Sequence, residues 1–218
     1  MQPEQDEAAA HPEQQEAFDF GPPQPLVRHP RPGERKSVLD MLGRAFFDDP
    51  VSIYLFPNEH RRQAGFAGFC GLAIDAFGAG AHVLTNDALQ GAAVWQKPSP
   101  KAPRFFQQVR MGLRMIWIIR GGVRRAIRLG DFMSEHHLHQ PHYYLAALGT
   151  DPVFQGQGIG SALMQPVLDR CDKERLPAYL ESSKQANIPF YNKHGFEIIE
   201  ELQIPDGPRL WPMIRQPG

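Results

Sequence analysis

The sequence predicts a single domain of the α/β class behind an acidic tail. Segments in which apolar residues repeat at helical spacing alternate with short segments typical of strands. Two pairs of strand-like segments flank tight turns, and another strand-like segment leads through a glycine-rich turn directly into a helix. The chain has 218 residues, of which 42% are hydrophobic, so it can bury a sizeable core, and this excludes wholesale disorder.

The overall charge is balanced but unevenly distributed. The chain carries 23 Lys+Arg and 24 Asp+Glu, a net charge of -1, which argues against a general nucleic-acid binder. Residues 1–24 hold six acidic residues and no Lys or Arg, and we interpret them as a disordered acidic tail before a domain at 25–218. Residues 97–130 hold nine Lys or Arg and no acidic residue.

The composition favours a cytoplasmic protein. Cys70 and Cys171 are too few for a disulfide scaffold and form no recognisable zinc motif. The acidic N-terminus lacks the apolar core of a signal peptide. The apolar stretch 64–84 is interrupted by Asp75 and five glycines, so we expect a buried helix there and no membrane span.

In the N-terminal half, helical spacing predicts helices over 34–47 and from Asn58 to about Phe77, with Asn58 as the cap of the second. A short strand and a turn are expected over 25–34. Strands over 81–85 and 89–96 flank a hairpin turn at Asn86-Asp87.

The C-terminal half begins with two basic helices, at about 104–119 and 122–137, for which we expect an apolar face on the core and a possible role as a lid. The remaining elements are expected in this order: strand 142–150, loop 151–157, helix 158–174 with a kink at Pro166, strand 178–182, short helix 186–194, and strands 196–204 and 208–216.

The glycine-rich turn is the strongest functional signal. The amide groups in the first turn of a helix lack partners and lie at the positive end of the helix dipole. Glycines let an anion approach these amides closely, so the turn suits a pyrophosphate. The Gly-Lys-Ser/Thr of a P-loop is missing. The candidate residues are Gln155, Gly156, Gln157, Gly158, Ile159, Gly160 and Ser161.

Two other interpretations of this turn remain open from the residues alone. One is a ligand-free turn. The other is a dinucleotide-binding Rossmann fold, because Glu181 follows the glycines by about 20 residues, as a ribose acceptor would. The late position of the motif and the helix–strand–strand order after Glu181 argue against the Rossmann fold.

Asn187 and Tyr191 are spaced i, i+4 and share one face of the short helix. A tyrosine in such a place can donate a proton to a leaving group. The alternatives are a half-buried core tyrosine and an asparagine that caps its own helix.

These residues carry a resemblance to a known family. Residues 148–164, LGTDPVFQGQGIGSALM, resemble the acetyl-CoA-binding motif of the GNAT acetyltransferase superfamily, with its Gln-x-x-Gly-x-Gly at 155–160. Residues 178–218 resemble the C-terminal end of the puromycin N-acetyltransferase group within it, including Asn-x-Pro-Phe-Tyr and the Pro-Asp-Gly-Pro turn before a Trp. The resemblance is specific over 143–218 and faint over 26–100.

The resemblance implies a GNAT fold: a mixed, mostly antiparallel sheet with a V-shaped splay and helices on both faces. It implies acetyl-CoA as cosubstrate, no metal, the pyrophosphate on the loop 155–161, and the pantetheine arm along Leu148, Gly149 and Thr150. Asn187 would hold that arm and Tyr191 would protonate the departing thiolate. Glu181 would be a base or an amine-orienting carboxylate, with a structural acceptor as the alternative.

The expected function is acetyl transfer to a primary amine of a small molecule, by direct attack in a ternary complex, in a monomer or homodimer. A non-catalytic acetyl-CoA-binding regulatory protein is the alternative. The resemblance places Phe46, Asp49 and Tyr54 beside the acceptor, unless they only pack the core, and His142 is a further candidate. The histidines at 136–142 are expected to be structural or near the substrate rather than metal ligands.

Overall fold

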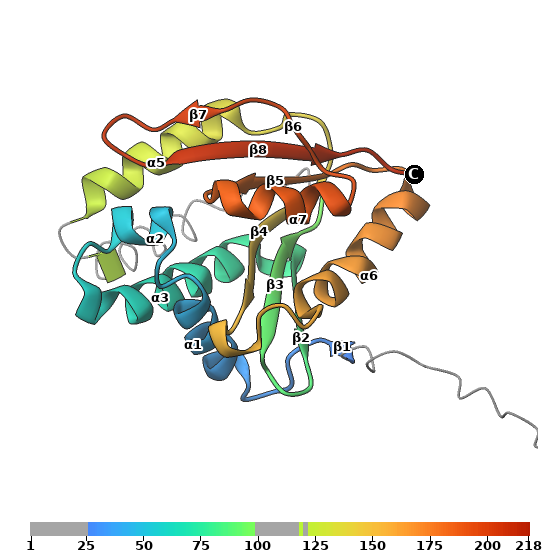
Figure 1. Ribbon diagram of the computed structural model, residues 1–218, viewed down its shortest axis with the longest axis horizontal. Helices are drawn as coiled ribbons and strands as arrows, with labels where there is room; N and C mark the ends of the chain where they lie inside the picture. The colour runs from blue at the N-terminus through green and yellow to red at the C-terminus, as the bar shows by residue number, and fades with distance from the viewer. Residues whose placement is uncertain (1–25, 99–117, 120–121) are drawn as a thin grey trace, which may run out of the picture.

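The computed structural model of the protein describes residues 26–98, 118–119 and 122–218 (Figure 1). The predicted acidic tail 1–24 and nearly all of the predicted helix 104–119 lie outside the described residues. None of the helices that the described residues form combines the length and the apolar character needed to cross a membrane. The apolar stretch around residue 70 forms part of a long helix packed against the core.

The strands form one mixed sheet in the order β1-β2-β3-β4-β5-β8-β6, with β7 paired to β8. Every neighbouring pair is antiparallel except β4 and β5, which run parallel, so the predicted mixed, mostly antiparallel sheet is confirmed. The strands are β1 (Val27–Arg28), β2 (Ala81–Asn86), β3 (Gly91–Gln96), β4 (Tyr143–Thr150), β5 (Ala178–Ser182), β6 (Glu197–Ile198), β7 (Leu202–Gln203) and β8 (Arg209–Arg215).

Helices cover both faces of the sheet, as predicted (Figure 1). One face carries α6 (Ile159–Glu174) and α7 (Ile188–Lys193), and the other carries α1 (Arg35–Ala45), α2 (Pro50–Leu55), α3 (Glu59–Phe77) and α5 (Val123–His136). Each of three short 3₁₀ turns lies between a helix and a strand along the chain: η1 (Gly78–Gly80), η2 (Pro152–Phe154) and η3 (Gln185–Asn187). Asn58 caps α3 through its side chain, as expected.

Each face of the sheet has its own core because successive strand residues point to opposite sides. Trp95 packs in the cluster under α6, whereas its neighbour Val94 packs in the cluster under α1 and α3. Leu163 of α6 and Leu42 of α1 are fully buried in these two clusters. The helices are therefore fixed to the sheet by ordinary apolar burial on both sides.

The sheet opens between β4 and β5. These strands pair only at Tyr143↔Ala178 and Tyr144↔Tyr179, and no further register follows toward the end of β4. On the other edge of β4, Trp95 pairs with Leu145 and Val94 with Ala147, so Ala146 is the extra residue of a β-bulge. In Figure 1, β8 and β5 run across the upper part of the view while β3 and β4 run downward. This is the predicted V-shaped splay.

Two element assignments from the sequence were wrong. The run 196–204 is not one strand: β6 and β7 are separate two-residue strands, and residues 199–201 leave the ladder apart from the Ile199 amide, which donates to Pro212 O at 2.8 Å. The short helix α2 was missed, because a segment of six residues that begins with a proline gives almost no periodic signal. The antiparallel sheet also rules out the Rossmann alternative, which needs parallel strands.

Leu163 gives a direct test of the α6 face. We expect Leu163→Ala to lower the free energy of unfolding by about 2–5 kcal/mol, because the truncation leaves a cavity at a side chain with 0% exposure. The matched control is Leu26→Ala, at a leucine that is 67% exposed. Chemical denaturation of both variants measures the difference, and equal losses would contradict the assigned packing.

Candidate active site

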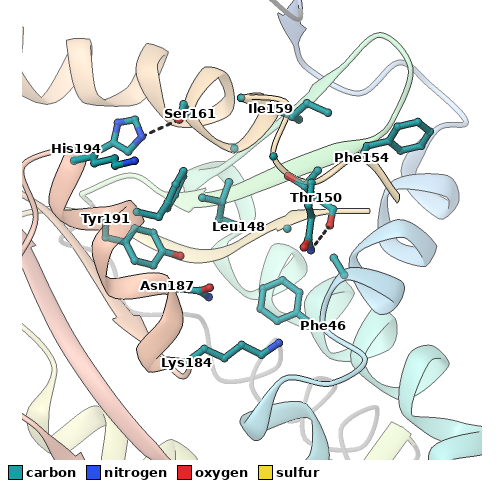
Figure 2. Close-up of a pocket in the computed structure, with 18 of the residues that line it drawn as sticks. Phe46, Leu148, Thr150, Phe154, Ile159, Ser161, Lys184, Asn187, Tyr191 and His194 are labelled. Atoms are coloured by element: carbon teal, nitrogen blue, oxygen red, sulfur yellow. Dashed lines mark hydrogen bonds between the residues drawn. The ribbon is translucent and has the colours of Figure 1, made fainter. Parts of the chain in front are cut away.

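A cavity of about 520 Å³ opens where the splay meets the glycine-rich loop. Figure 2 shows its wall, with residues from α1, β4, the loop, α6, η3 and α7. Eleven of the twelve residues predicted to bind the cofactor line it: Leu148, Gly149, Thr150, Gln155, Gly156, Gly158, Ile159, Gly160, Ser161, Asn187 and Tyr191. Gln157 is the exception; it is exposed and is not part of the wall.

The loop presents its backbone to this cavity. Gly156 and Gly158 have φ angles of +78° and +77°, a region that glycine enters without strain. No atom lies within 4 Å of where a Cβ at either position would stand, so the space over the loop is open. Gly158 caps α6, and the first helical bond is donated by the Ala162 amide to Gly158 O, which leaves the preceding amides for a ligand.

Contacts with α1 hold the loop in place. Asp151 accepts bonds from Arg44 of α1, at 2.8 Å to Nε and 2.7 Å to Nη2. A Cβ on Gly149 would stand 2.9 Å from Ala45 Cβ, so α1 approaches β4 as closely as it does only because this position is glycine. The loop is thus positioned by an ion pair on one side and by close packing on the other.

The cavity also contains basic side chains that sequence reasoning missed. Lys184, Lys193 and His194 line it, and His194 Nε2 lies 3.0 Å from Ser161 Oγ (Figure 2). Burial lowers the pKa of His194, with Arg215 as a further cause. Lys193 and His194 could have been found from the sequence, because they directly follow Tyr191 at the end of the short helix. They lie beside the loop because α7 packs on α6.

Tyr191 of α7 and Asn187, the last residue of η3 directly before α7, both point into the cavity (Figure 2). The predicted shared face is therefore the cavity face. Tyr191 is 8% exposed, and burial, followed by the negative charge of Asp49, raises the pKa of its phenol above the ordinary value. The phenol thus stays protonated over the whole neutral range.

A second cavity of about 280 Å³ adjoins the first and is largely aromatic. Phe46 and Asp49 line both cavities, so the two share a wall. Helix α5, predicted as a basic helix over 122–137, adds Leu129 and Met133 to the second cavity. The rings in its wall are those of Phe46, Phe66, Phe69, Phe77 and Tyr144, and its carboxylates are those of Asp49 and Glu181.

Asp49 is a buried carboxylate that caps α2 and also lines both cavities. Its Oδ1 caps α2 by accepting from the Val51 and Ser52 amides, and its Oδ2 accepts from the Ser183 hydroxyl. Burial raises the pKa of Asp49 in spite of these bonds. Next to it, Lys184 pairs with Asp48 at 2.8 Å, so two contacts join the start of α2 to the end of β5 across the splay.

Glu181 lines the second cavity with only 5% of its side chain exposed. Its Oε1 lies 3.3 Å from Nδ1 of His137, a residue for which the sequence predicted no role beyond its histidine cluster. Burial, followed by the charge of Glu181, raises the pKa of Tyr144 well above its ordinary value. Glu181 is thus a largely buried side chain on the wall of the second cavity, in contact with His137.

Two predicted substrate residues lie outside both walls. The ring of Tyr54 packs in the cluster beneath α1 and α3, beside the place where a Cβ on Gly207 would stand, so it serves as a core residue. His142 bonds Gln140 O at 2.7 Å and contacts the rings of His137 and Tyr179. Within the described part of the chain, no three His, Cys, Asp or Glu side chains gather closely enough to hold a metal ion.

Comparison with known proteins agrees with this geometry. Residues 133–216 match the model of the acetyltransferase (GNAT) domain. An uncharacterized N-acetyltransferase of Schizosaccharomyces pombe is 29% identical over 203 residues, which cover 84% of this chain and 79% of that protein. A peptidyl-lysine N-acetyltransferase of Escherichia coli is 35% identical over 77 residues, 33% of this chain and 51% of that protein.

Solved structures show the same fold. A Corynebacterium glutamicum protein described as histone acetyltransferase HPA2 and related acetyltransferase aligns with a TM-score of 0.63 and 22% identity, covering 89% of this chain and 97% of its own. Arylalkylamine N-acetyltransferase 2 of Aedes aegypti aligns with a TM-score of 0.59 and 11% identity, covering 89% and 100%. Residues 133–216 are thus similar to a GNAT acetyltransferase domain, and the comparisons support an acetyl-CoA-dependent N-acetyltransferase.

Asp49→Asn tests the cost of the buried carboxylate. The pKa of Asp49 is higher in the folded protein than in the unfolded chain. Protonation of Asp49 therefore stabilises the folded protein at a pH below the unfolded-state pKa, and this stabilisation is lost as the pH rises through the folded-state pKa. At pH 7 the charged form therefore destabilises the fold. The asparagine keeps an oxygen for the cap, so we expect a gain of ~0.5–2 kcal/mol at pH 7 that shrinks toward pH 4.

Denaturation at the two pH values measures this gain. Asp48→Asn is the matched control, because Asp48 is 80% exposed and its bond with Lys184 lowers its pKa. The ionised Asp48 side chain stabilises the fold at any pH above its unfolded-state pKa, so Asp48→Asn should slightly lower the free energy of unfolding at pH 7. A loss for Asp49→Asn at pH 7 would show that its hydrogen bonds outweigh its desolvation.

Proposed function

We propose that this GNAT domain transfers the acetyl group of acetyl-CoA to the primary amine of a small, largely apolar or aromatic molecule, by direct attack in a ternary complex. The observation that supports it most is the pair of adjoining cavities with the common wall at Phe46 and Asp49. One has a polar, glycine-lined floor and the other an aromatic lining with two carboxylates. A cosubstrate in the first would meet an acceptor in the second at that wall.

The first cavity fits the cosubstrate. A pyrophosphate on the loop 155–161 would be bound by backbone amides and the positive end of the α6 dipole. Lys193 supplies side-chain charge that the loop itself lacks, and His194 beside Ser161 offers a hydrogen-bonding ring nitrogen. The backbone of Leu148, Gly149 and Thr150 on the open side of β4 is free of β5 and suits the pantetheine arm, with Asn187 opposite.

Tyr191 is the proposed acid and Glu181 the proposed base. A phenol that stays protonated can give its proton to the sulfur as the carbon–sulfur bond breaks. Glu181 in the acceptor cavity can take a proton from the incoming ammonium. The remaining catalysis would come from positioning of the two reactants and from stabilisation of the charge that develops in the transition state.

The acceptor cavity indicates the substrate class. At about 280 Å³, with five aromatic rings and two buried carboxylates, it suits a cationic amine with an apolar body. The sequence of residues 178–218 further supports a place near the puromycin N-acetyltransferase group. Of the two sequence relatives named above, one is uncharacterized and the other is described as acting on peptidyl-lysine, so the small-amine class rests on this cavity and on the sequence of residues 178–218.

A thiol-release assay with acetyl-CoA and a panel of amines tests the function. We expect turnover with arylalkylamines and with puromycin, and at least tenfold lower kcat/KM with polar amines of similar size such as glucosamine. Lysine-containing and N-terminal peptides complete the panel. A preference for peptides would contradict the small-molecule class, and acetyl-CoA binding without turnover on any amine would favour a non-catalytic regulatory protein.

Tyr191→Phe tests the acid. We expect kcat to fall by about 10²-fold or more, because proton transfer by a placed side chain contributes at least that much. The affinity for acetyl-CoA, measured by calorimetry, should change less than threefold. Tyr143→Phe is the matched control, since Tyr143 bonds Glu174 away from both cavities. Unchanged turnover in Tyr191→Phe would show that Tyr191 is not the general acid.

A further inference from the structure

A proton must leave the acceptor cavity in every cycle. If the amine binds as an ammonium ion, the new nitrogen–carbon bond leaves one of its three protons on the amide. A second proton ends on the thiol sulfur through Tyr191 as the carbon–sulfur bond breaks. The third is released, so a base that takes it must give it up before the next cycle, and Glu181 has only 5% of its side chain exposed.

His137 is the imidazole in contact with this carboxylate, beside the phenols of Tyr144 and Tyr179, whose pKa values are raised by burial and by the charge of Glu181. It directly follows α5 and approaches Glu181 of β5 with Nδ1, 3.3 Å from Oε1. Among the described residues, the basic nitrogen that lies within 4 Å of Glu181 is Nδ1 of His137, and one-third of the side chain of His137 is exposed. A buried carboxylate on the cavity wall thus touches a ring that reaches solvent.

Aromatic rings from β4, β5 and the residue before β4 surround the ring of His137. Tyr144 of β4 and Tyr179 of β5 meet it edge-on, with ring centroids 5.0 and 5.1 Å away. His142 lies 5.0 Å away at the start of β4, and burial lowers its pKa, so it stays neutral near pH 7. Glu181 is the acidic group that faces His137.

We propose, resting on the acetyl-transfer function above, that His137 is a positioning residue that carries the amine proton from Glu181 to solvent. Glu181 takes the proton from the ammonium and passes it to Nδ1 of the neutral ring. The resulting imidazolium releases a proton from Nε2 to water, and exchange with water restores the starting tautomer. Glu181 is thereby a carboxylate again for the next amine.

The test uses three variants and the best amine of the panel at saturating acetyl-CoA. We expect His137→Ala to lower kcat by about 10-fold to 100-fold, with the KM for the amine changed less than threefold. His137→Gln keeps a hydrogen-bonding group beside Glu181 but carries no proton, so it should be as slow as His137→Ala. His136→Gln, on a ring bonded to Phe132 O, should keep the wild-type rate.

Added imidazole separates proton transfer from packing. It should restore part of the His137→Ala rate, whereas pyrazole, which has the same shape and is a far weaker base, should not. In a Glu181→Gln background, His137→Ala should have no further effect, because both side chains act on one proton.

Three results would overturn the inference: wild-type turnover in His137→Gln, equal effects of imidazole and pyrazole, or multiplicative losses in the double variant. In each of these three cases the wild-type enzyme still acetylates amines, so only the proton-carrying role of His137 is contradicted. Wild-type protein without turnover on any amine would instead overturn the proposed function, and this inference with it.

Discussion

The separation of β4 and β5 after two residue pairs is the constraint on which the rest of the site depends. Had the strands continued to pair, the second half of β4 would be buried in a sheet with no backbone left for a ligand. Instead, the bulge at Ala146 redirects β4, and β5 pairs with β8 on its other side. The opening is stable because both strands keep a complete partner on their outer edge and a packed core on each face.

The regular parts of this arrangement could be predicted because they depend on local chemistry. Asn58 caps α3, and glycines allow the turn before α6, whatever else surrounds them. Spacing along one helix was enough to place Asn187 and Tyr191 on the same face, although only the packing of α7 shows that this face borders the cavity. The wall residues from the loop follow in the same way from consecutive positions in the chain.

What could not be predicted depends on contacts between distant segments. His137 and Glu181 are separated by 44 positions, and Asp49 and Ser183 by 134, so no local pattern brings either pair together. The resemblance places Tyr54 beside the acceptor with Phe46 and Asp49, but the ring of Tyr54 packs against the core cluster under α1 and α3, outside both cavity walls. The break between β6 and β7 likewise arises from their separate pairings with β8.

The wall formed by Phe46 and Asp49 has an energetic consequence. A ligand in either cavity touches the same two side chains, so its binding fixes part of the surface that the other ligand meets. For the two substrates proposed above, the free energies of binding would then be coupled, and the coupling would be reciprocal: acetyl-CoA would change the affinity for the amine by the same factor as the amine changes the affinity for acetyl-CoA. Such cooperativity would need only the shared wall and no movement of the sheet.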